Sequence, residues 1–217
     1  MKPIVISLDG NIGAGKSTLL GYLKKKYPQF HFIDEPVENW MNLKDENGND
    51  LLSLFYKDTP RWSYTLQNCA FITRVNKVKD AIKEWKEKCN HDPSEEKNNV
   101  FITERSILTD RYVFAEMLKS SGQMNLLEWN LYLEWFNALH ELSQIDAIIE
   151  VVTDYDECKK RICKRGRKGE ESIGLDYLSS LEIQHNKWLS STPLPVLKIK
   201  SEIDELEKVE QFIKEIK

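Results

Sequence analysis

The sequence of 217 residues lacks the features that divide a chain or carry it into a membrane. It has no linker rich in proline, glycine and serine and no internal repeat, so we expect residues 1–217 to form a single domain. No apolar run approaches the roughly 20 residues that a membrane-spanning helix needs. These absences argue against a multidomain protein and against a membrane protein.

The chain also lacks a large excess of charge of either sign, since its net charge is only −4. A chain without an overall basic field is not expected to bind nucleic acid non-specifically. The cysteines lack the paired spacing of zinc sites and of CxxC redox motifs, which indicates reduced thiols at Cys69, Cys89, Cys158 and Cys163. The N-terminal residues show no targeting leader, and we therefore expect a soluble, cytoplasmic protein.

Glycine is sparse overall, yet three glycines gather in one loop that fits the pattern of a glycine, four residues, a second glycine, lysine, and serine or threonine. An apolar run from Ile4 to Leu8 precedes the loop, and leucines at helical spacing follow it. Glycines let such a loop turn tightly and aim its backbone N–H groups at phosphate. We expect Lys16 to contact the β- and γ-phosphates and Ser17 to ligate Mg²⁺. The predicted phosphate-binding residues are Gly10, Asn11, Ile12, Gly13, Ala14, Gly15, Lys16, Ser17 and Thr18.

Apolar runs of strand length alternate with helical patterns along the chain. This alternation predicts an α/β fold with a parallel five-stranded sheet covered on both faces. A mostly helical insertion from Trp40 to Asn99 follows the second strand; it includes a helix that begins near Asp58 and continues to Trp85, and then a polar loop at 90–99. Further helices are expected at 106–118 and 126–142. The predicted strands are 4–8, 30–33, 100–103, 145–152 and 195–199.

Charged residues follow the second and third predicted strands, where ligands bind in open α/β sheets. Glu35 is a candidate base for an acceptor hydroxyl, although a solvated acid at a strand end has the same appearance in sequence. Glu104 and Arg105 offer a carboxylate for a metal ion and a cation for the migrating charge, as phosphoryl transfer requires. Asp110 and Arg111 point in different directions on a helix and cannot share one role.

A basic cluster lies between Lys159 and Lys168, where seven of ten residues are lysine or arginine. Such a run is typical of a solvated face or of a nucleic-acid patch. Here Gly166 and Gly169 interrupt it, which favours a hinged lid, at about 161–171, whose arginines close over phosphates.

Taken together, these motifs resemble the deoxynucleoside kinase family, and most of all its deoxycytidine and deoxyguanosine kinase branch. The resemblance rests on GNIGAGKST at 10–18, EPVENW at 35–40, PRWSYTLQ at 60–67, ERSILTDRYVFA at 104–115, RICKRGRKGEE at 161–171 and LDYLSSLEIQHNKWL at 175–189. The sequence departs from the family at Gly169, where an acidic residue is common, and near 200–204. The resemblance implies a P-loop kinase fold, with a doubly wound sheet and a helical lid.

The resemblance also implies a role for each matching residue. Glu35 corresponds to the general base, Arg105 to the arginine beside the reacting 5′-hydroxyl, and Gln67 to the glutamine that reads the base. Ser17 and Glu104 match the metal-side residues. The other correspondences are the charged pair Arg74 and Asp110 at the base, Tyr56 and Glu170 at the sugar 3′-hydroxyl, the pocket walls Ile12, Val37, Trp40, Phe71 and Phe114, and the lid arginines Arg161, Arg165 and Arg167.

We therefore expect an enzyme of nucleotide salvage that moves the γ-phosphoryl group of ATP or another triphosphate, with Mg²⁺, to the 5′-hydroxyl of a deoxyribonucleoside. Deoxycytidine and purine deoxynucleosides are expected above thymidine, and the family implies a homodimer through helices at 71–85 and 126–142. One alternative is a thymidylate-type monophosphate kinase, which would need cations where Glu35 stands. A more distant one is a GTPase-like switch, with DxxG at 45–48 and part of a guanine motif at Asn76 and Lys77.

Overall fold

The computed structural model describes residues 1–200 and 205–216. Its sheet has five parallel strands in the order β2-β3-β1-β4-β5, so the predicted doubly wound α/β architecture is confirmed. The first strand, β1, lies in the middle, with Ile4 opposite Val100 on one side and Ile6 opposite Ala147 on the other. The strands are β1 (Ile4–Asp9), β2 (His31–Ile33), β3 (Val100–Glu104), β4 (Ala147–Val151) and β5 (Val196–Ile199).

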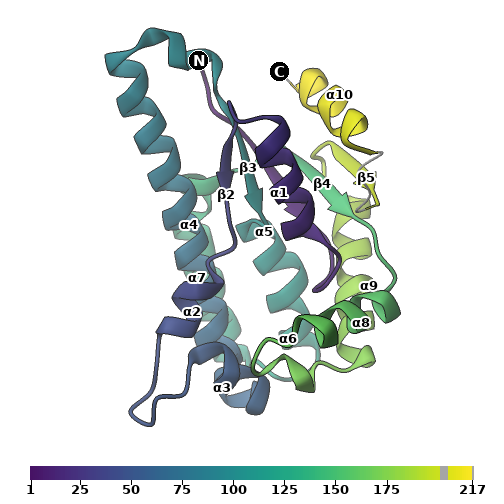
Figure 1. Ribbon diagram of the computed structural model, residues 1–217. Helices are drawn as coiled ribbons and strands as arrows, with labels where there is room; N and C mark the ends of the chain where they lie inside the picture. The colour runs from purple at the N-terminus through teal and green to yellow at the C-terminus, as the bar shows by residue number, and fades with distance from the viewer. Residues whose placement is uncertain (201–204, 217) are drawn as a thin grey trace.

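Helices cover both faces of the sheet (Figure 1), because strand side chains alternate between two apolar cores. Ile6 and Leu8 of β1 pack with α1, α8 and α10, whereas Val5 of β1 and Phe101 of β3 pack with α4, α6 and α9. The helices are α1 (Lys16–Lys26), α2 (Val37–Asn42), α3 (Leu51–Lys57), α4 (Thr59–His91), α5 (Ile107–Thr109), α6 (Glu116–Ser120), α7 (Leu126–Leu139), α8 (Tyr155–Arg165), α9 (Leu175–Ser191) and α10 (Leu206–Ile216).

The long helix α4 begins as predicted, with the Asp58 side chain accepting from the Arg61 N–H and Pro60 in the first turn. It continues past Trp85, however, and a 3₁₀ helix η1 (Pro93–Lys97) follows, so the predicted loop at 90–99 is wrong. The reason is tertiary: the buried Trp85 ring donates to the Glu95 carbonyl and ties η1 back onto α4.

Two other predicted helices are divided. The segment 106–118 forms α5, a π-helix η2 (Asp110–Ala115) and part of α6, while 126–142 forms α7 followed by a 3₁₀ helix η3 (His140–Ser143). Asp110 faces inward from η2 and Arg111 pairs with Glu116 outside, so the prediction that they point apart is confirmed.

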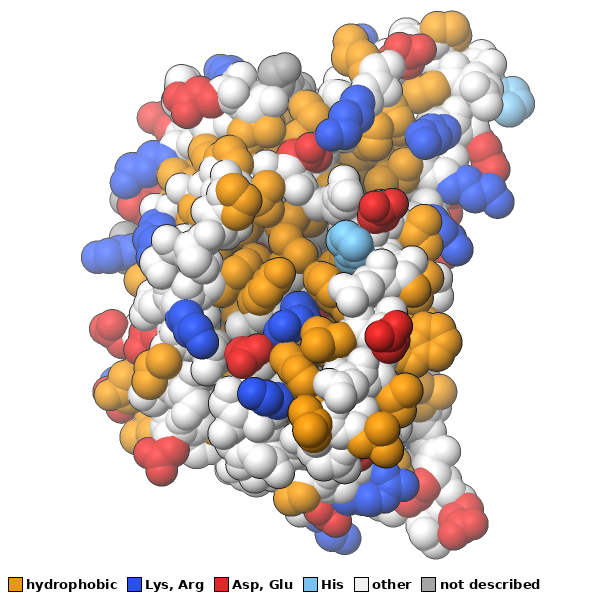
Figure 2. Space-filling model, turned by 180° about the vertical axis from the view of Figure 1, so that it is seen from behind, with side chains coloured by type: hydrophobic (Ala, Val, Ile, Leu, Met, Phe, Trp, Pro, Cys, Tyr) orange, Lys and Arg blue, Asp and Glu red, His pale blue; other side chains and the backbone are white. Residues whose placement is uncertain are grey.

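A third core lies between α4 and α7. Phe71 and Val75 of α4 pack there against Trp129, Tyr132 and Phe136 of α7. Trp129 and Phe136 therefore belong to the interior of the protein. Several hydrophobic side chains are nevertheless exposed on the face seen from behind in Figure 2. The exposed large hydrophobic residues of α7 are Leu126, Leu127, Leu131 and Trp135.

The phosphate loop, α2, α3 and α8 gather at one end of the sheet, opposite the two chain termini (Figure 1). This is the end where β1 and β3 deliver their last residues, as expected for ligand binding in a parallel sheet. Apart from Lys200, the segment near 200–204 lies outside the described residues. Within the described part, no helix is both long enough and apolar enough to cross a bilayer.

Candidate active site

The loop after β1 adopts backbone conformations that favour glycine. Gly10 and Gly13 have φ of 129° and 80°, and a Cβ on Gly13 would lie 2.6 Å from the Cys158 carbonyl oxygen. Gly15, also at positive φ, precedes α1, whose N-terminus points the positive end of its dipole at the loop. Lys16 folds back, and its Nζ donates to the carbonyls of Gly10 at 3.1 Å and Asn11 at 2.8 Å. The loop therefore has the geometry of a phosphate cradle.

Lys16 is almost fully buried, and this burial lowers its pKa to about 8. Its neighbour Ser17 is more accessible and donates from Oγ to Oε1 of Glu104, at 3.0 Å. A hydroxyl and a carboxylate side by side are the hard oxygen donors that Mg²⁺ prefers. The described residues contain no cluster of three or more His, Cys, Asp or Glu able to hold a metal ion on their own. The donor set fits an ion that is held partly by phosphate oxygens.

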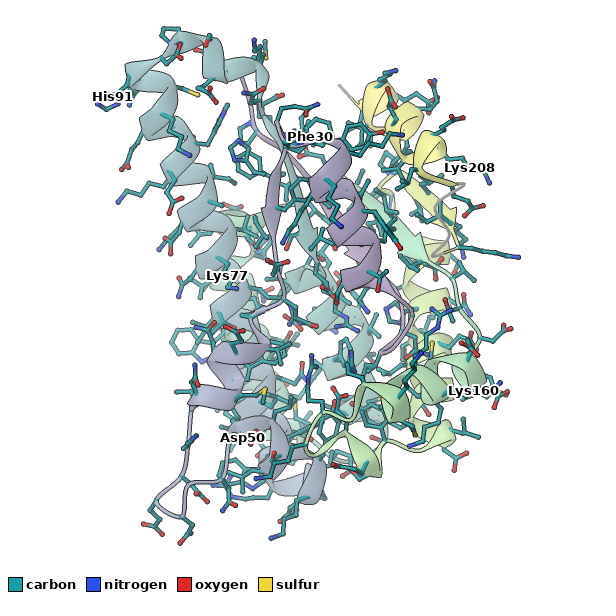
Figure 3. The ribbon with its side chains drawn as sticks, in the orientation of Figure 1. Phe30, Asp50, Lys77, His91, Lys160 and Lys208 are labelled. Carbon is teal, nitrogen blue, oxygen red and sulfur yellow. The ribbon has the colours of Figure 1, made fainter. Side chains whose placement is uncertain are left out.

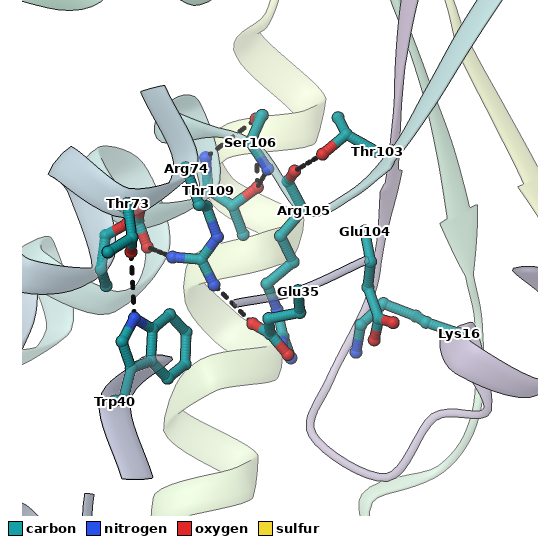
Figure 4. A network of polar contacts seen from close by, with 12 residues as sticks. Lys16, Glu35, Trp40, Thr73, Arg74, Thr103, Glu104, Arg105, Ser106 and Thr109 are labelled. Carbon is teal, nitrogen blue, oxygen red and sulfur yellow. Dashed lines mark hydrogen bonds and ion pairs between the residues drawn. The ribbon is translucent and has the colours of Figure 1, made fainter. Parts of the chain in front are cut away.

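Four charged side chains from different elements form one buried network (Figure 4). Arg74 of α4 donates to Asp110 on one side and to Glu35 on the other. Arg105, directly after β3, donates from Nη1 to the same Glu35 oxygen, Oε1, at 2.6 Å and from Nη2 to the Gly10 carbonyl at 3.4 Å. Glu35 is thus held between two arginines beside the phosphate loop.

This network sets the protonation of its carboxylates. Burial would raise the pKa of Glu35, but Arg105 and Arg74 outweigh it and lower the pKa to about 2. Burial dominates at Asp110 and raises its pKa to about 6, although Arg74 opposes it. Glu35 is therefore ionised throughout the physiological range, and Asp110 is ionised above about pH 6.

An aromatic wall is tied to this network. The Trp40 indole donates to Thr73 Oγ1 at 3.0 Å, and the Arg74 guanidinium lies 5.1 Å from the Trp40 ring centroid. Nearby, Gln67 is buried, and its Oε1 has no hydrogen-bond partner. Gln67 also lines the polar cavity described below, and a buried amide oxygen without a partner is a group that a ligand can satisfy.

One cavity of about 760 Å³ unites these groups, within the range typical of small-molecule sites. In Figure 3, Lys77, which lines the cavity, lies midway along α4, and Asp50 lies near α3 at the end of the molecule opposite the termini. The cavity is lined by these predicted site residues: Ile12, Gly13, Gly15, Lys16, Ser17, Thr18, Glu35, Val37, Trp40, Tyr56, Gln67, Arg74, Glu104, Arg105, Asp110, Phe114, Arg161, Arg165, Arg167 and Glu170.

Four other predicted site residues do not line the cavity. Gly10, Asn11 and Ala14 contribute carbonyl oxygens instead, which accept from Lys16 and Arg161. The prediction of Phe71 as a pocket wall is not met, because its side chain is fully buried in the α4–α7 core. Phe71 lies about 60° round the helix from Arg74, which turns it toward α7.

The basic segment of α8 stands over the cavity. Arg165 donates from Nε and Nη2 to Oε2 of Glu170, at 3.1 and 2.7 Å, and Arg167 donates from Nη1 to Oε1 of Glu170, at 2.9 Å. Arg161 contacts the loop through the Ala14 carbonyl at 3.1 Å. Gly166 ends α8 at φ 62°, so the chain reverses there. The lid arginines and the buried Glu170 thus form one cluster.

Sequence reasoning missed several lining residues. Tyr177 of α9 lies within the quoted LDYLSSLEIQ segment, yet no pattern singled it out, and burial raises its pKa well above the usual range. Leu52, Phe55, Leu66 and Ala70 line the apolar part, and only their helical spacing hinted at this.

The two GTPase-like motifs fail on their surroundings. Residues 45–48 lie in a turn closed by an antiparallel bridge between Lys44 and Asp50, and none of them lines the cavity. Asn76 and Lys77 lie within the long helix α4, and they therefore do not form a loop around a guanine base.

A phosphate loop after the central strand, arginines from two elements and a carboxylate facing the same cavity define a phosphotransferase of the P-loop kinase class. Comparison with known proteins narrows this class. The chain belongs to the deoxynucleoside kinase family, whose sequence model matches residues 6–217. It is accordingly a kinase with a nucleoside acceptor and a nucleoside triphosphate donor.

The relatives carry names that agree with the family. "Probable deoxycytidine kinase" of Fowlpox virus is 38% identical over 206 residues, covering 92% of this chain and 79% of the relative. "Deoxycytidine kinase 2" of Gallus gallus is 36% identical, covering 85% and 73%. Mitochondrial deoxyguanosine kinase of Xenopus laevis is 34% identical, covering 85% and 72%.

Proposed function

We propose that this kinase phosphorylates the 5′-hydroxyl of deoxycytidine and of purine deoxynucleosides in preference to thymidine, within nucleotide salvage. The observation that carries the proposal is the Arg74–Asp110 pair beside the unpaired Gln67 amide in the cavity. A glutamine amide can match the paired donor and acceptor of cytosine or adenine. The buried ion pair occupies space that a thymine methyl group would need, and the arginine offers donors to base nitrogens or an exocyclic oxygen.

Glu35 acts as the base in this proposal. Both arginine bonds fall on its Oε1, so Oε2 is the oxygen that can accept from the 5′-hydroxyl. Arg105 then lies beside the reacting oxygen, where developing negative charge needs a cation. Tyr56 and Glu170 hold the sugar 3′-hydroxyl. Positioning and charge stabilisation account for most of the catalysis in phosphoryl transfer.

The donor side uses the loop and the lid. Lys16 and the loop N–H groups contact the phosphates of ATP or a related triphosphate, and Arg161, Arg165 and Arg167 close over them. Ser17 and Glu104 supply oxygen ligands to Mg²⁺. The ion, when bound, neutralises charge on the phosphate oxygens.

We further propose a homodimer that buries the exposed apolar face of α7 together with part of α4. Leu126 and Leu127 are 70% and 69% exposed, and Trp135 is 51% exposed. Large exposed apolar patches mark interaction sites on soluble proteins. A single domain over 1–217, a cytoplasmic location and the absence of a nucleic-acid partner stay predictions from the sequence.

The testing experiment measures kcat/KM for deoxycytidine, deoxyadenosine, deoxyguanosine and thymidine, each with ATP and with UTP as donor. We expect thymidine to fall at least roughly tenfold below the preferred substrate, about 1.4 kcal/mol. A preference for thymidine would refute the proposed base selection. Turnover of deoxynucleoside monophosphates, but not of deoxynucleosides, would instead identify the monophosphate-kinase alternative.

A further inference from the structure

Arg105 has a strained backbone. Its φ of 61° makes it the sole non-glycine residue at positive φ within residues 1–200 and 205–216. A non-glycine residue in this region is strained and persists only when its surroundings fix it. Because the same residue places its guanidinium against Glu35, the contacts that hold its backbone bear on the reaction.

Direct bonds hold the two peptide groups of Arg105. Its N–H donates to the Leu8 carbonyl at 3.0 Å. Its own carbonyl accepts from Thr103 Oγ1 at 3.0 Å (Figure 4). The next residue, Ser106, is fixed by a reciprocal cap. Its N–H donates to Thr109 Oγ1 at 3.1 Å, and the Thr109 N–H donates to Ser106 Oγ at 3.4 Å.

Asp9 anchors this cap from the central strand. It is the last residue of β1, it is fully buried, and its two carboxylate oxygens accept separately from Ser7 Oγ and Thr109 Oγ1. A hydroxyl has one proton, so Thr109, which gives its proton to Asp9, must accept from Ser106 in the contact between their two hydroxyls at 3.2 Å. The direction of each bond from Asp9 to Ser106 is therefore fixed.

We propose that Asp9 is a positioning residue for phosphoryl transfer: through Thr109 and Ser106 it holds Arg105 in its left-handed conformation and so keeps the guanidinium at Glu35. The proposal rests on the role proposed above for Arg105 beside the 5′-hydroxyl. The chain of bonds links the end of β1, immediately before the phosphate loop, to the turn after β3. It thereby sets the acceptor-side arginine relative to the donor-side loop.

A carboxylate suits this place better than a neutral group. Asp9 receives two hydroxyl protons, which an ionised carboxylate accepts without offering a competing donor. Burial raises the pKa of Asp9, while the two hydroxyl bonds and the nearby Arg105 and Lys16 oppose that change. The buried anion also offsets part of the positive charge at Arg105 and Lys16.

The test removes the relay at two points. Thr109→Val keeps the shape of the side chain and deletes the hydroxyl; Asp9→Ala deletes the acceptor. Misplacement of a reacting group by about 1 Å can cost on the order of 100-fold. We expect Thr109→Val to lower kcat about 10- to 100-fold with the nucleoside KM within about threefold, and Thr109→Ser to restore kcat to within about threefold of wild type. Asp9→Ala, once thermal denaturation has shown that it is folded, should have the same kcat and nucleoside KM as Thr109→Val.

Two comparisons separate positioning from general stability. Ser63→Ala deletes another fully buried hydroxyl, which donates to the Thr59 carbonyl within α4, and it should leave kcat within about twofold. In an Arg105→Ala background, Thr109→Val should change kcat less than about twofold, because residues acting through one group are not additive.

The outcomes are distinct. Wild-type kcat in Thr109→Val, or the same loss with and without Arg105, would overturn the relay while leaving the proposed function intact. A wild-type kcat in Arg105→Ala would overturn both the proposed role of Arg105 and the relay.

Discussion

Replacement of Glu35 by glutamine tests the centre of the charge network. Glutamine keeps the length and hydrogen-bonding reach of the side chain but cannot take up a proton. If Glu35 is the base, kcat should fall about 10²- to 10⁴-fold while the nucleoside KM changes little. A phosphotransfer assay with deoxycytidine and saturating ATP measures both quantities.

The structure also predicts a loss of stability. The pKa of Glu35 is lowered from an ordinary 4.5 to about 2, so the folded protein favours the ionised form by about 3 kcal/mol. For a chain of this size, each kcal/mol moves Tm by about 2–4 °C, and Glu35→Gln should lower Tm by about 6–12 °C. Because the folded pKa is depressed, this stabilisation is present above pH 4.5 and is lost as the pH falls toward 2. Glu35→Gln should lack this part of the pH dependence of stability.

Glu116→Gln is the matched control. Glu116 makes the same kind of bond with a single arginine, Arg111, and lies outside the cavity. It should keep wild-type kcat and lose less than about 1 kcal/mol. If Glu35→Gln retained more than about a third of the wild-type kcat, Glu35 would not be the base. An unchanged Tm would show that ionised Glu35 does not stabilise the folded protein by this amount.

Lys16→Ala should lower kcat/KM about 100-fold or more without unfolding the chain, because Lys16 is proposed to bind the phosphates of the donor. A kcat/KM above half the wild-type value would contradict this. Replacing both Arg165 and Arg167 by alanine should reduce turnover and also weaken nucleoside binding, measured by calorimetry without donor, because Glu170 then loses both of its arginine partners; wild-type turnover would contradict their role over the phosphates. Arg74→Met with Asp110→Ala should raise thymidine use relative to deoxycytidine, and unmoved ratios would remove the pair from the base pocket. Because Asp110 titrates near pH 6 and releases Arg74 when protonated, kcat/KM should decline below about pH 6, and Asp110→Asn should abolish that limb.

The sheet and the phosphate loop were predictable because their signals are local. The five apolar runs are short, bounded and separated by helical patterns, and the loop pattern from Gly10 to Thr18 combines three glycines with a strand and a helix. The strand-end rule then placed Glu35 and Arg105 at one edge without any knowledge of their contacts.

Contacts between elements that are far apart in the sequence were harder to predict. The family resemblance paired Arg74 with Asp110, but nothing in the sequence indicated that the same guanidinium also reaches Glu35. Phe71 was misplaced because a rotation of about 60° along α4 separates the cavity from the core against α7, and a motif match does not specify that rotation. The η1 helix depends on the bond from Trp85 to Glu95, which joins residues across a reversal of the chain.

The two faces of α4 have a practical consequence for engineering. Gln67 and Arg74 line the cavity, while Phe71 and Val75 lock the same helix against Tyr132 of α7. Packed interiors transmit displacement because they have few voids. A mutant library directed at base selectivity should therefore include Phe71 and Tyr132, since a change of volume there can shift Gln67 without altering any group that touches the nucleoside.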